Sequence, residues 1–175
     1  MNDARIPTFL FLLLVLFAVL QCVHVYPQLP DVMASHFDAR GTPNGWQPKH
    51  AFFILIAVVI LVCTIPAFIV PWRLPSMSPA RINLPNKAYW LAPERREETW
   101  CFFRVQMAWW GCALLSILLY SMFQAINANL PSIGHFNSEG MWYALAAFLI
   151  FSVIWMVGLI RHFSKLPDSN SLPPR

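Results

Sequence analysis

The chain has 175 residues, of which 58% are hydrophobic and only 11% are charged. Its mean hydropathy of +0.53 is too high for an ordinary soluble domain and indicates a membrane protein. The net charge of +4 does not indicate a nucleic-acid-binding protein, because the basic residues collect on one side of the predicted membrane topology.

Four apolar runs of about 20 residues lack Asp, Glu, Lys and Arg, and each is long enough to cross about 30 Å of hydrocarbon as a helix. They predict an all-α membrane protein with four transmembrane helices, at about 6–26, 51–70, 93–126 and 141–160. The third run itself begins at 105, and its helix is extended back because Pro93 suits a first helical turn. We treat 1–175 as one four-helix membrane domain with a cytoplasmic loop at 71–104 and a disordered tail at 164–175.

The lysines and arginines predict the orientation of these helices. Two of them, Arg40 and Lys49, lie between the first and second helices, and none lies between the third and fourth. The others flank the opposite helix ends: Arg5, Arg73, Arg81, Lys87, Arg95, Arg96, Arg104, Arg161, Lys165 and Arg175. The positive-inside rule therefore predicts that the N and C termini are both cytoplasmic. The first run is expected to be a retained helix and not a cleaved signal peptide, because it is long and no Ala-x-Ala site follows it.

The outer loop over 27–50 is rich in turn-forming residues and holds most of the chemically distinctive side chains. Its distinctive residues, at fixed spacings, are Leu29, Pro30, His36, Phe37, Asp38, Gly41, Pro43, Trp46 and Lys49. Residues 32–37 alternate briefly, as in a short extended segment. Such a segment would place His36 and Asp38 on one face, with the imidazole against a carboxylate or with both as metal ligands. A structural hydrogen bond, partner binding and metal or catalytic chemistry all stay open for His36, and Trp46 is either an interfacial anchor or a binding residue.

These residues resemble the signature of a bacterial membrane family that carries domain of unknown function 1648 and includes the SdpI-like immunity proteins. The signature covers 29–49, and 82–96 resembles a second segment found in some members. Ala34 departs from the pattern, since the family often has proline there. The resemblance implies a protein of the bacterial cytoplasmic (inner) membrane with a role in immunity, in some members with signalling to a cytoplasmic repressor.

Two features are expected toward the cytoplasmic side. Pro66 lies within the second helix and should kink it, and the prolines of the following loop forbid long regular structure before residue 93. The segment 94–104 mixes charged and aromatic residues. This mixture fits either an interfacial cuff at the headgroups or a docking surface for a cytoplasmic regulator.

Uncharged polar side chains recur on one face of the third helix. They are Ser116, Tyr120, Gln124 and Asn127. Hydrogen bonding between helices explains such a stripe, and the wall of a small cavity open to the outside is the alternative.

The loop before the fourth helix echoes the first outer loop. It repeats the Leu-Pro and His-Phe-Asx-x-x-Gly pattern, with His135 in the place of His36 and Gly140 in the place of Gly41. The offset from 36 to 135, 99 residues, also maps the first helix onto the third. The chain is therefore compatible with two parallel helical hairpins, and chance recurrence of a short motif is the alternative.

Both loops leave the bundle at the same end, which predicts one concave outer patch that binds a peptide or a metal ion. The candidate ligand-binding residues are His36, Phe37, Asp38, Gly41, Trp46, His135 and Glu139. Zinc accepts the nitrogen and oxygen atoms of four of them, namely His36, Asp38, His135 and Glu139.

Three functions fit these features. The first is an SdpI-like immunity or signalling protein that meets an extracytoplasmic peptide, protein or envelope signal through its outer loops. The second is a membrane metalloenzyme with zinc on the outer face, although no His-Glu-x-x-His motif accompanies the candidate ligands. The third is a small transporter, for which an ionisable residue deep in a span would be expected. No catalytic residue is predicted, and the expected partners are the lipid bilayer, the extracytoplasmic ligand and a cytoplasmic regulator.

Overall fold

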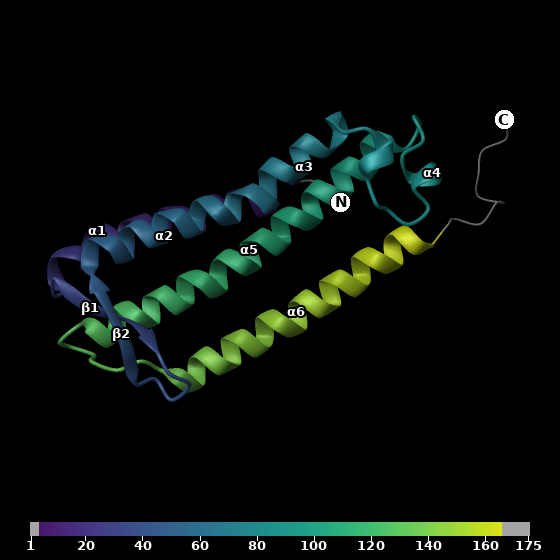
Figure 1. The fold of residues 1–175 in the computed structure, drawn as a ribbon. Helices are drawn as coiled ribbons and strands as arrows, with labels where there is room; N and C mark the ends of the chain where they lie inside the picture. The colour runs from purple at the N-terminus through teal and green to yellow at the C-terminus, as the bar shows by residue number, and fades with distance from the viewer. Residues whose placement is uncertain (1–3, 166–175) are drawn as a thin grey trace.

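A computed structural model describes residues 4–165 of the chain. Its long helices are α1 (Arg5–Val25), α2 (Lys49–Thr64), α5 (Arg96–Asn129) and α6 (Ser138–Ser164) (Figure 1). Together with their irregular continuations they form four candidate membrane spans in this part of the chain: Arg5–Gln28, Lys49–Ser76, Arg96–Asn129 and Ser138–Ser164. The prediction of an all-α membrane protein with four spanning helices is confirmed, and the chain is an integral membrane protein.

Helix α5 is the central helix of the bundle and packs against α1, α2 and α6 (Figure 1). Buried side chains form one group toward the end of the bundle that carries the strands: Val25, Leu29, Met33, Phe52, Ile56, Ala125 and Ile126. A second group lies toward the other end: Phe11, Cys63, Ala67, Cys112 and Leu115. We call these the hairpin end and the α4 end. Because Leu29 and Met33 follow α1 and belong to the first group, burial of apolar surface anchors the start of the strand segment on the bundle.

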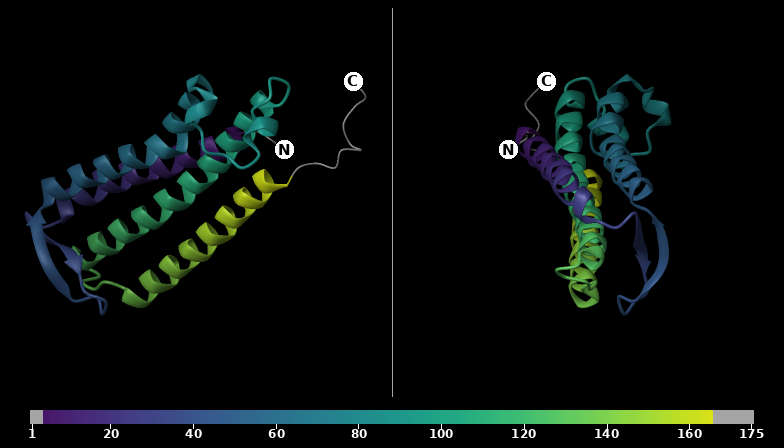
Figure 2. Two further views of the ribbon diagram at one scale, coloured as in Figure 1. Left: turned by 45° about the vertical axis from the view of Figure 1, so that its right-hand side comes forward. Right: turned by 90° about the vertical axis from the view of Figure 1, so that its left-hand side faces the viewer.

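The first outer segment contains an antiparallel hairpin of β1 (Val32–Phe37) and β2 (Pro43–Pro48). A single-turn helix, η1 (Tyr26–Gln28), joins it to α1. The extended segment predicted over 32–37 is confirmed. The second strand is not evident from the sequence, since prolines at both ends and Gly45 within it are poor strand formers. Figure 2 shows the hairpin lying across the end of the helix bundle.

Pro66 interrupts the second span, as predicted. Residues Ile65–Ile69 form a π-helical turn, η2, which leads into α3 (Val70–Arg73) and η3 (Leu74–Ser76). Proline cannot donate a backbone hydrogen bond, and a local change of helical pitch accommodates that loss. Helical structure therefore continues past the predicted end at 70.

The loop at the α4 end contains only short elements, as its prolines predict. They are η4 (Pro79–Arg81) and α4 (Lys87–Trp90). The start predicted for the third helix at Pro93 is wrong by three residues, because the N–H groups of Arg95 and Arg96 both donate to the carbonyl of Ala92 in a preceding turn.

Helix α5 is longer than the hydrocarbon core of a bilayer is thick. It has 34 residues, so at 1.5 Å per residue it is about 51 Å long, against about 30 Å of hydrocarbon. Its first turn carries Glu97 and Glu98, which favour the positive end of the helix dipole.

The α4 end holds the last turn of α6. The Asn86 side chain donates to the carbonyls of Phe163 and Ser164 at 3.1 and 3.0 Å, and the Trp90 indole donates to Phe163 at 2.9 Å. His162 stacks on Phe102, with 3.9 Å between ring centroids. Residue 164, expected in a disordered tail, is still helical, and the tail from 166 to 175 lies outside the described residues.

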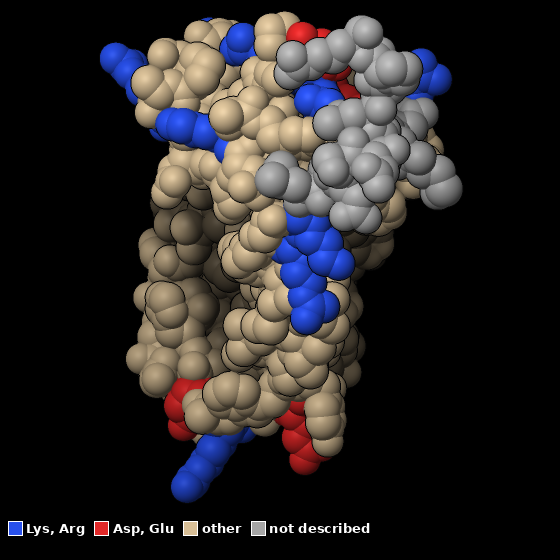
Figure 3. Space-filling model, turned by 90° about the vertical axis from the view of Figure 1, so that its right-hand side faces the viewer, with Lys and Arg blue, Asp and Glu red and all other residues tan. Residues whose placement is uncertain are grey.

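Most basic residues of the described chain lie at the α4 end, across the face that Figure 3 presents. They are Arg5, Arg73, Arg81, Lys87, Arg95, Arg96, Arg104, Arg161 and Lys165. Several have local partners: Arg95 lies over the ring of Tyr89 and Arg104 over Trp72, while Arg96 donates to the carbonyl of Pro75 at 2.7 Å. These contacts favour the interfacial cuff over a free docking surface for this segment.

Candidate ligand-binding cleft at the hairpin end

A cleft of about 420 Å³ lies between the hairpin and the facing ends of α5 and α6. We call it the hairpin cleft. The hairpin side is formed by Ser35, His36, Phe37, Asp38 and Ala39, and the helix side by Ser121, Ala125, Phe136, Ser138, Met141, Trp142 and Leu145. Its volume is within the range of about 300–1,000 Å³ typical of small-molecule sites. The view in Figure 2 shows how the hairpin overhangs these helix ends.

The turn of the hairpin is built on Asp38. Its Oδ1 accepts hydrogen bonds from the N–H groups of Arg40 and Thr42 at 2.8 and 2.9 Å, and its own N–H donates to Thr42 O at 2.9 Å. The bonds from Thr42 and Arg40 lower the pKa of the Asp38 carboxyl below its ordinary value. Asp38 is therefore a carboxylate at neutral pH.

His36 is placed on the hairpin by contact with Gly45. A Cβ added at Gly45 would lie 3.0 Å from the Cβ and Cδ2 of His36, so the imidazole packs tightly over the glycine and would have to shift by a few tenths of an ångström to admit a larger residue. No hydrogen bond or ion pair joins His36 to Asp38 in the described chain, although both side chains line the hairpin cleft. The hypothesis of an imidazole held directly against this carboxylate is wrong.

The two His-Phe motifs meet in space. The Phe37 and Phe136 rings stack with 4.5 Å between centroids and 21° between planes. Gly41 lies against the same residue, with a positive φ of 85° and with only 2.9 Å from an added Cβ to the carbonyl oxygen of Phe136. Positive φ and close backbone approach are both suited to glycine. The two loops, 99 residues apart in their motifs, therefore meet where the hairpin side and the helix side of the cleft join.

Hydrogen bonds fix the start of α6 beside the hairpin. The Trp142 indole donates to the carbonyl of Ala39 at 3.1 Å. Asn137 caps α6 by accepting from the N–H of Gly140 at 2.9 Å. Its carbonyl accepts from Gln124 of α5 at 3.1 Å. The hairpin, α5 and α6 are thus joined around the cleft.

Two members of the polar stripe on α5, Gln124 and Tyr120, are joined by a hydrogen bond. Gln124 is buried, and besides its bond to Asn137 its side-chain amide donates to the Tyr120 hydroxyl at 3.0 Å. Hydrogen bonding between elements, the first explanation of the stripe, thus holds at Gln124. Ser116 and Tyr120 line a groove between α5 and α6, and the alternative explanation, that the stripe forms the wall of a cavity open to the outside, stays a prediction.

Asn129 of α5 holds the hairpin in place, and no pattern in the sequence analysis singles it out. Its amide binds both polar groups of Ala34: Ala34 N–H donates to Asn129 Oδ1 and Asn129 Nδ2 donates to Ala34 O, each at 2.8 Å. In the described chain, β1 has no neighbouring strand on the edge that faces α5. The two hydrogen bonds between Ala34 and the Asn129 amide, which lies in the last turn of α5, take the place of such a strand. Only the position of an Asn immediately before Leu130-Pro131, where a helix ends, could have drawn attention to it.

The remaining candidate residues lie around the cleft and do not line it. Trp46 is 62% exposed on β2. The Nδ1 atom of His135 lies 3.1 Å from the carbonyl of Ile133, and Glu139 is exposed in the first turn of α6. Residues 4–165 contain no group of three or more His, Cys, Asp and Glu side chains that could hold a metal ion. The four candidate zinc ligands therefore do not form a metal site in the described chain.

Replacing Gly41 by Ala should loosen the contact between the two loops. The positive φ and the contact with Phe136 O together cost roughly 1–3 kcal/mol of local stability, and amide hydrogen exchange over 38–42 should accelerate accordingly. Gly134→Ala is the matched control, because Gly134 also has a positive φ, of 66°, but an added Cβ meets nothing within 4 Å. Equal acceleration over 38–42 in both variants would contradict a role for the Phe136 contact.

Comparison with known proteins gives a match for the segment that contains the hairpin. No curated protein matches the sequence, and no solved structure matches it. Residues 12–62, which run from α1 through the hairpin into α2, match the model of a domain of unknown function (DUF1648).

Proposed function

We propose that this membrane protein receives an extracytoplasmic ligand, a peptide or another envelope signal, in the hairpin cleft. The observation that carries the proposal is that two loops from distant parts of the chain join through Phe37 and Phe136 to enclose a cleft with polar groups on its wall. This role agrees with the SdpI-like immunity and signalling proteins that the sequence resembles.

An unpaired polar atom supports ligand binding at this site. The Oγ of Ser35 is buried, and it has no hydrogen-bond partner among the described residues. Ser35 also lines the hairpin cleft. A buried hydroxyl without a partner is costly, and a ligand in the cleft would supply the missing partner.

The proposal requires the hairpin end to face the outside. The excess of Lys and Arg at the α4 end supports cytoplasmic termini in a bacterial inner membrane. We expect a cysteine at Ser132, in the loop before α6, to react with a membrane-impermeant thiol reagent in intact cells. A cysteine at Ser78, in the loop at the α4 end, should react only after the membrane is opened. If the cysteine at Ser78 reacts in intact cells and the cysteine at Ser132 does not, the hairpin end faces the cytoplasm.

The direct test is photocrosslinking from within the cleft. A photocrosslinking amino acid is placed at position 36, whose side chain lines the cleft, and separately at position 46, on the exposed face of β2. In membranes of the native host we expect an adduct from position 36, identified by mass spectrometry. An adduct from position 46 as well would show that the ligand also covers Trp46. Absence of any adduct from position 36 would contradict the proposal.

His36→Ala should reduce ligand binding about tenfold, the loss expected when roughly 1.4 kcal/mol of contact is removed. His36 is exposed, so the amount of protein in the membrane should stay unchanged. Asn44→Ala, an exposed substitution on β2 outside the cleft, is the control. A parallel fall of abundance and binding would instead indicate that His36 only supports the hairpin.

A further inference from the structure

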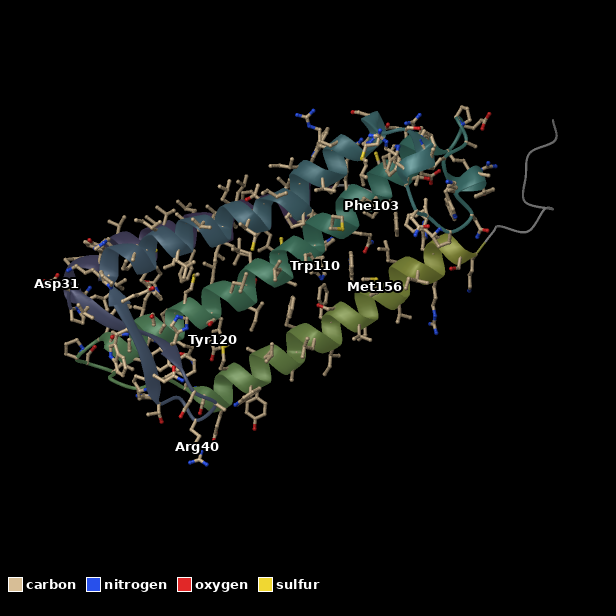
Figure 4. All side chains as sticks on the ribbon, in the orientation of Figure 1. Asp31, Arg40, Phe103, Trp110, Tyr120 and Met156 are labelled. Carbon is tan, nitrogen blue, oxygen red and sulfur yellow. The ribbon has the colours of Figure 1, made fainter. Side chains whose placement is uncertain are left out.

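Two hydrogen-bond donors near the start of α5 are buried without an acceptor. The Nε1 atom of Trp100 and the Nε atom of Arg104 have no hydrogen-bond partner among the described residues, and Trp100 is only 3% exposed. The two residues are one helical turn apart and so share a face of α5. Figure 4 labels Phe103, which lies between them in the sequence, on the part of α5 beside α3. Burying an N–H group without an acceptor is costly, so both donors are suited to an acceptor that a ligand brings.

This face of α5 is turned toward α3 and the turn that follows it. One turn before Trp100, the Nη2 atom of Arg96 donates to the carbonyl of Pro75 at 2.7 Å. One turn after it, the guanidinium of Arg104 lies 4.6 Å from the centre of the Trp72 ring. Trp100 lies between these two arginines on the same face and therefore faces the same segment. We call the surface formed by Trp72, Arg96, Trp100 and Arg104 the α3/α5 surface.

The α3/α5 surface lies at the depth of the lipid headgroups. The apolar run of the second span ends at 70 and that of the third begins at 105, within two residues of Trp72 and next to Arg104. Trp72 is 65% exposed, and tryptophan and arginine at the ends of spans are typical of the membrane interface. The phosphate groups of phospholipids occupy this depth and supply acceptor oxygens there.

The positive charges on and beside this surface favour an anion. Arg96 and Arg104 belong to the surface itself, and Arg73 is exposed next to Trp72. The side chain of Arg104 is 17% exposed, so part of it is accessible from outside although its Nε atom is buried. Guanidinium groups form strong, charge-assisted hydrogen bonds with phosphate. Basic sites between membrane helices near the headgroups are accordingly suited to anionic lipids.

The carboxylates at the start of α5 leave these donors available. Glu97 lies 3.3 Å from the Nη1 atom of Arg104, but the Glu97 side chain is 77% exposed, and ion pairs with an exposed partner are weak. Glu98 is one residue further round the helix, and its charge acts on His162 of α6. Neither carboxylate accepts a hydrogen bond from the Nε atom of Arg104 in the described chain.

We infer that the α3/α5 surface binds the phosphate of one anionic phospholipid, such as phosphatidylglycerol. The Trp100 indole and the Nε of Arg104 donate to its oxygens, and the exposed Trp72 ring turns away from Arg104 to admit it. A soluble phosphate compound has the same chemistry, and the test separates the two sources. This site is at the opposite end of the bundle from the hairpin cleft, so it is independent of the proposed function.

The test follows the indole N–H resonances of the full chain, labelled with ¹⁵N at tryptophan, in maltoside micelles without phosphate. The resonance of Trp100 is assigned by its loss in Trp100→Phe. Phosphatidylglycerol should move it downfield, and phosphatidylcholine should need about a tenfold higher concentration for the same shift. Inorganic phosphate that acts at the concentration of the lipid would support the phosphate site but assign it to a soluble compound. No shift with any of the three would overturn the inference.

Arg104→Lys tests the hydrogen bond apart from the charge, because lysine keeps the charge and removes the Nε donor. It should raise the concentration of phosphatidylglycerol required about tenfold, while unchanged resonances of the other tryptophans show that the fold is kept. Arg81→Gln is the control: it removes a whole charge from an exposed position of η4, outside the α3/α5 surface, and should leave binding unchanged. If Arg81→Gln weakens binding as much as Arg104→Lys does, the general positive charge of the α4 end attracts the lipid and the inferred site is wrong.

Discussion

Replacing Asn129 by Leu should release the hairpin from the bundle. Leucine has the same branched side-chain skeleton as asparagine, but it leaves the N–H and C=O of Ala34 without partners, and Ala34 is only 7% exposed. Each unsatisfied buried group costs about 1–3 kcal/mol, so the local loss is roughly 2–6 kcal/mol. This is comparable to much of the stability of an ordinary domain, which is about 5–15 kcal/mol.

The measurement is amide hydrogen exchange over 32–37 in detergent or nanodiscs. At the lower end of the estimate, exchange at Ala34 should accelerate about 30-fold. Asn127→Leu is the control, because Asn127 lies two residues earlier on α5 and none of the side-chain hydrogen bonds of the described chain involves it. If both variants exchange alike, the Asn129 amide does not hold the hairpin.

The membrane-spanning helices could be predicted from the sequence because each depends on a local property, a run of side chains that lipid accepts. Their ends were less predictable. The third helix begins at Arg96 and not at Pro93, and a turn in which the N–H groups of Arg95 and Arg96 both donate to the carbonyl of Ala92 precedes it. The sequence does not predict β2 either, because pairing with β1 holds this strand and its own residues have a low propensity for strands.

The candidate site was predicted in part. The echo between the two His-Phe motifs drew attention to segments that do meet, through Phe37 and Phe136. Which neighbouring side chains line the cleft depends on how α6 starts relative to the hairpin, and hydrogen bonds of Trp142 and Gln124 decide this. Such long-range contacts leave no periodicity in the sequence. The parallel repeat of two helical hairpins stays a prediction.

The close approach of α5 to the second span depends on Gly111. This residue faces η2, where a Cβ added to it would lie against the Cβ of Ala67, well inside van der Waals contact. Both residues are buried, and Ala67 belongs to the core group of the α4 end. Small residues at such a crossing allow two membrane helices to pack backbone to backbone. The π-helical turn that contains Pro66 and the glycine of α5 are therefore parts of one packing arrangement.

Gly111→Ala should lower the free energy of unfolding by about 1–3 kcal/mol, because the overpacking outweighs the gain of about 1 kcal/mol in helix propensity. Gly158→Ala is the matched control: an added Cβ there meets nothing within 4 Å, so the same substitution in α6 should be neutral or slightly stabilising. Thermal unfolding in one detergent compares the two variants directly. Combining Gly111→Ala with Ala67→Gly removes the colliding methyl group and should restore part of the loss, as a positive coupling in a double-mutant cycle. If Gly111→Ala and Gly158→Ala shift stability in the same direction and by the same amount, the approach of η2 to α5 does not limit the size of residue 111.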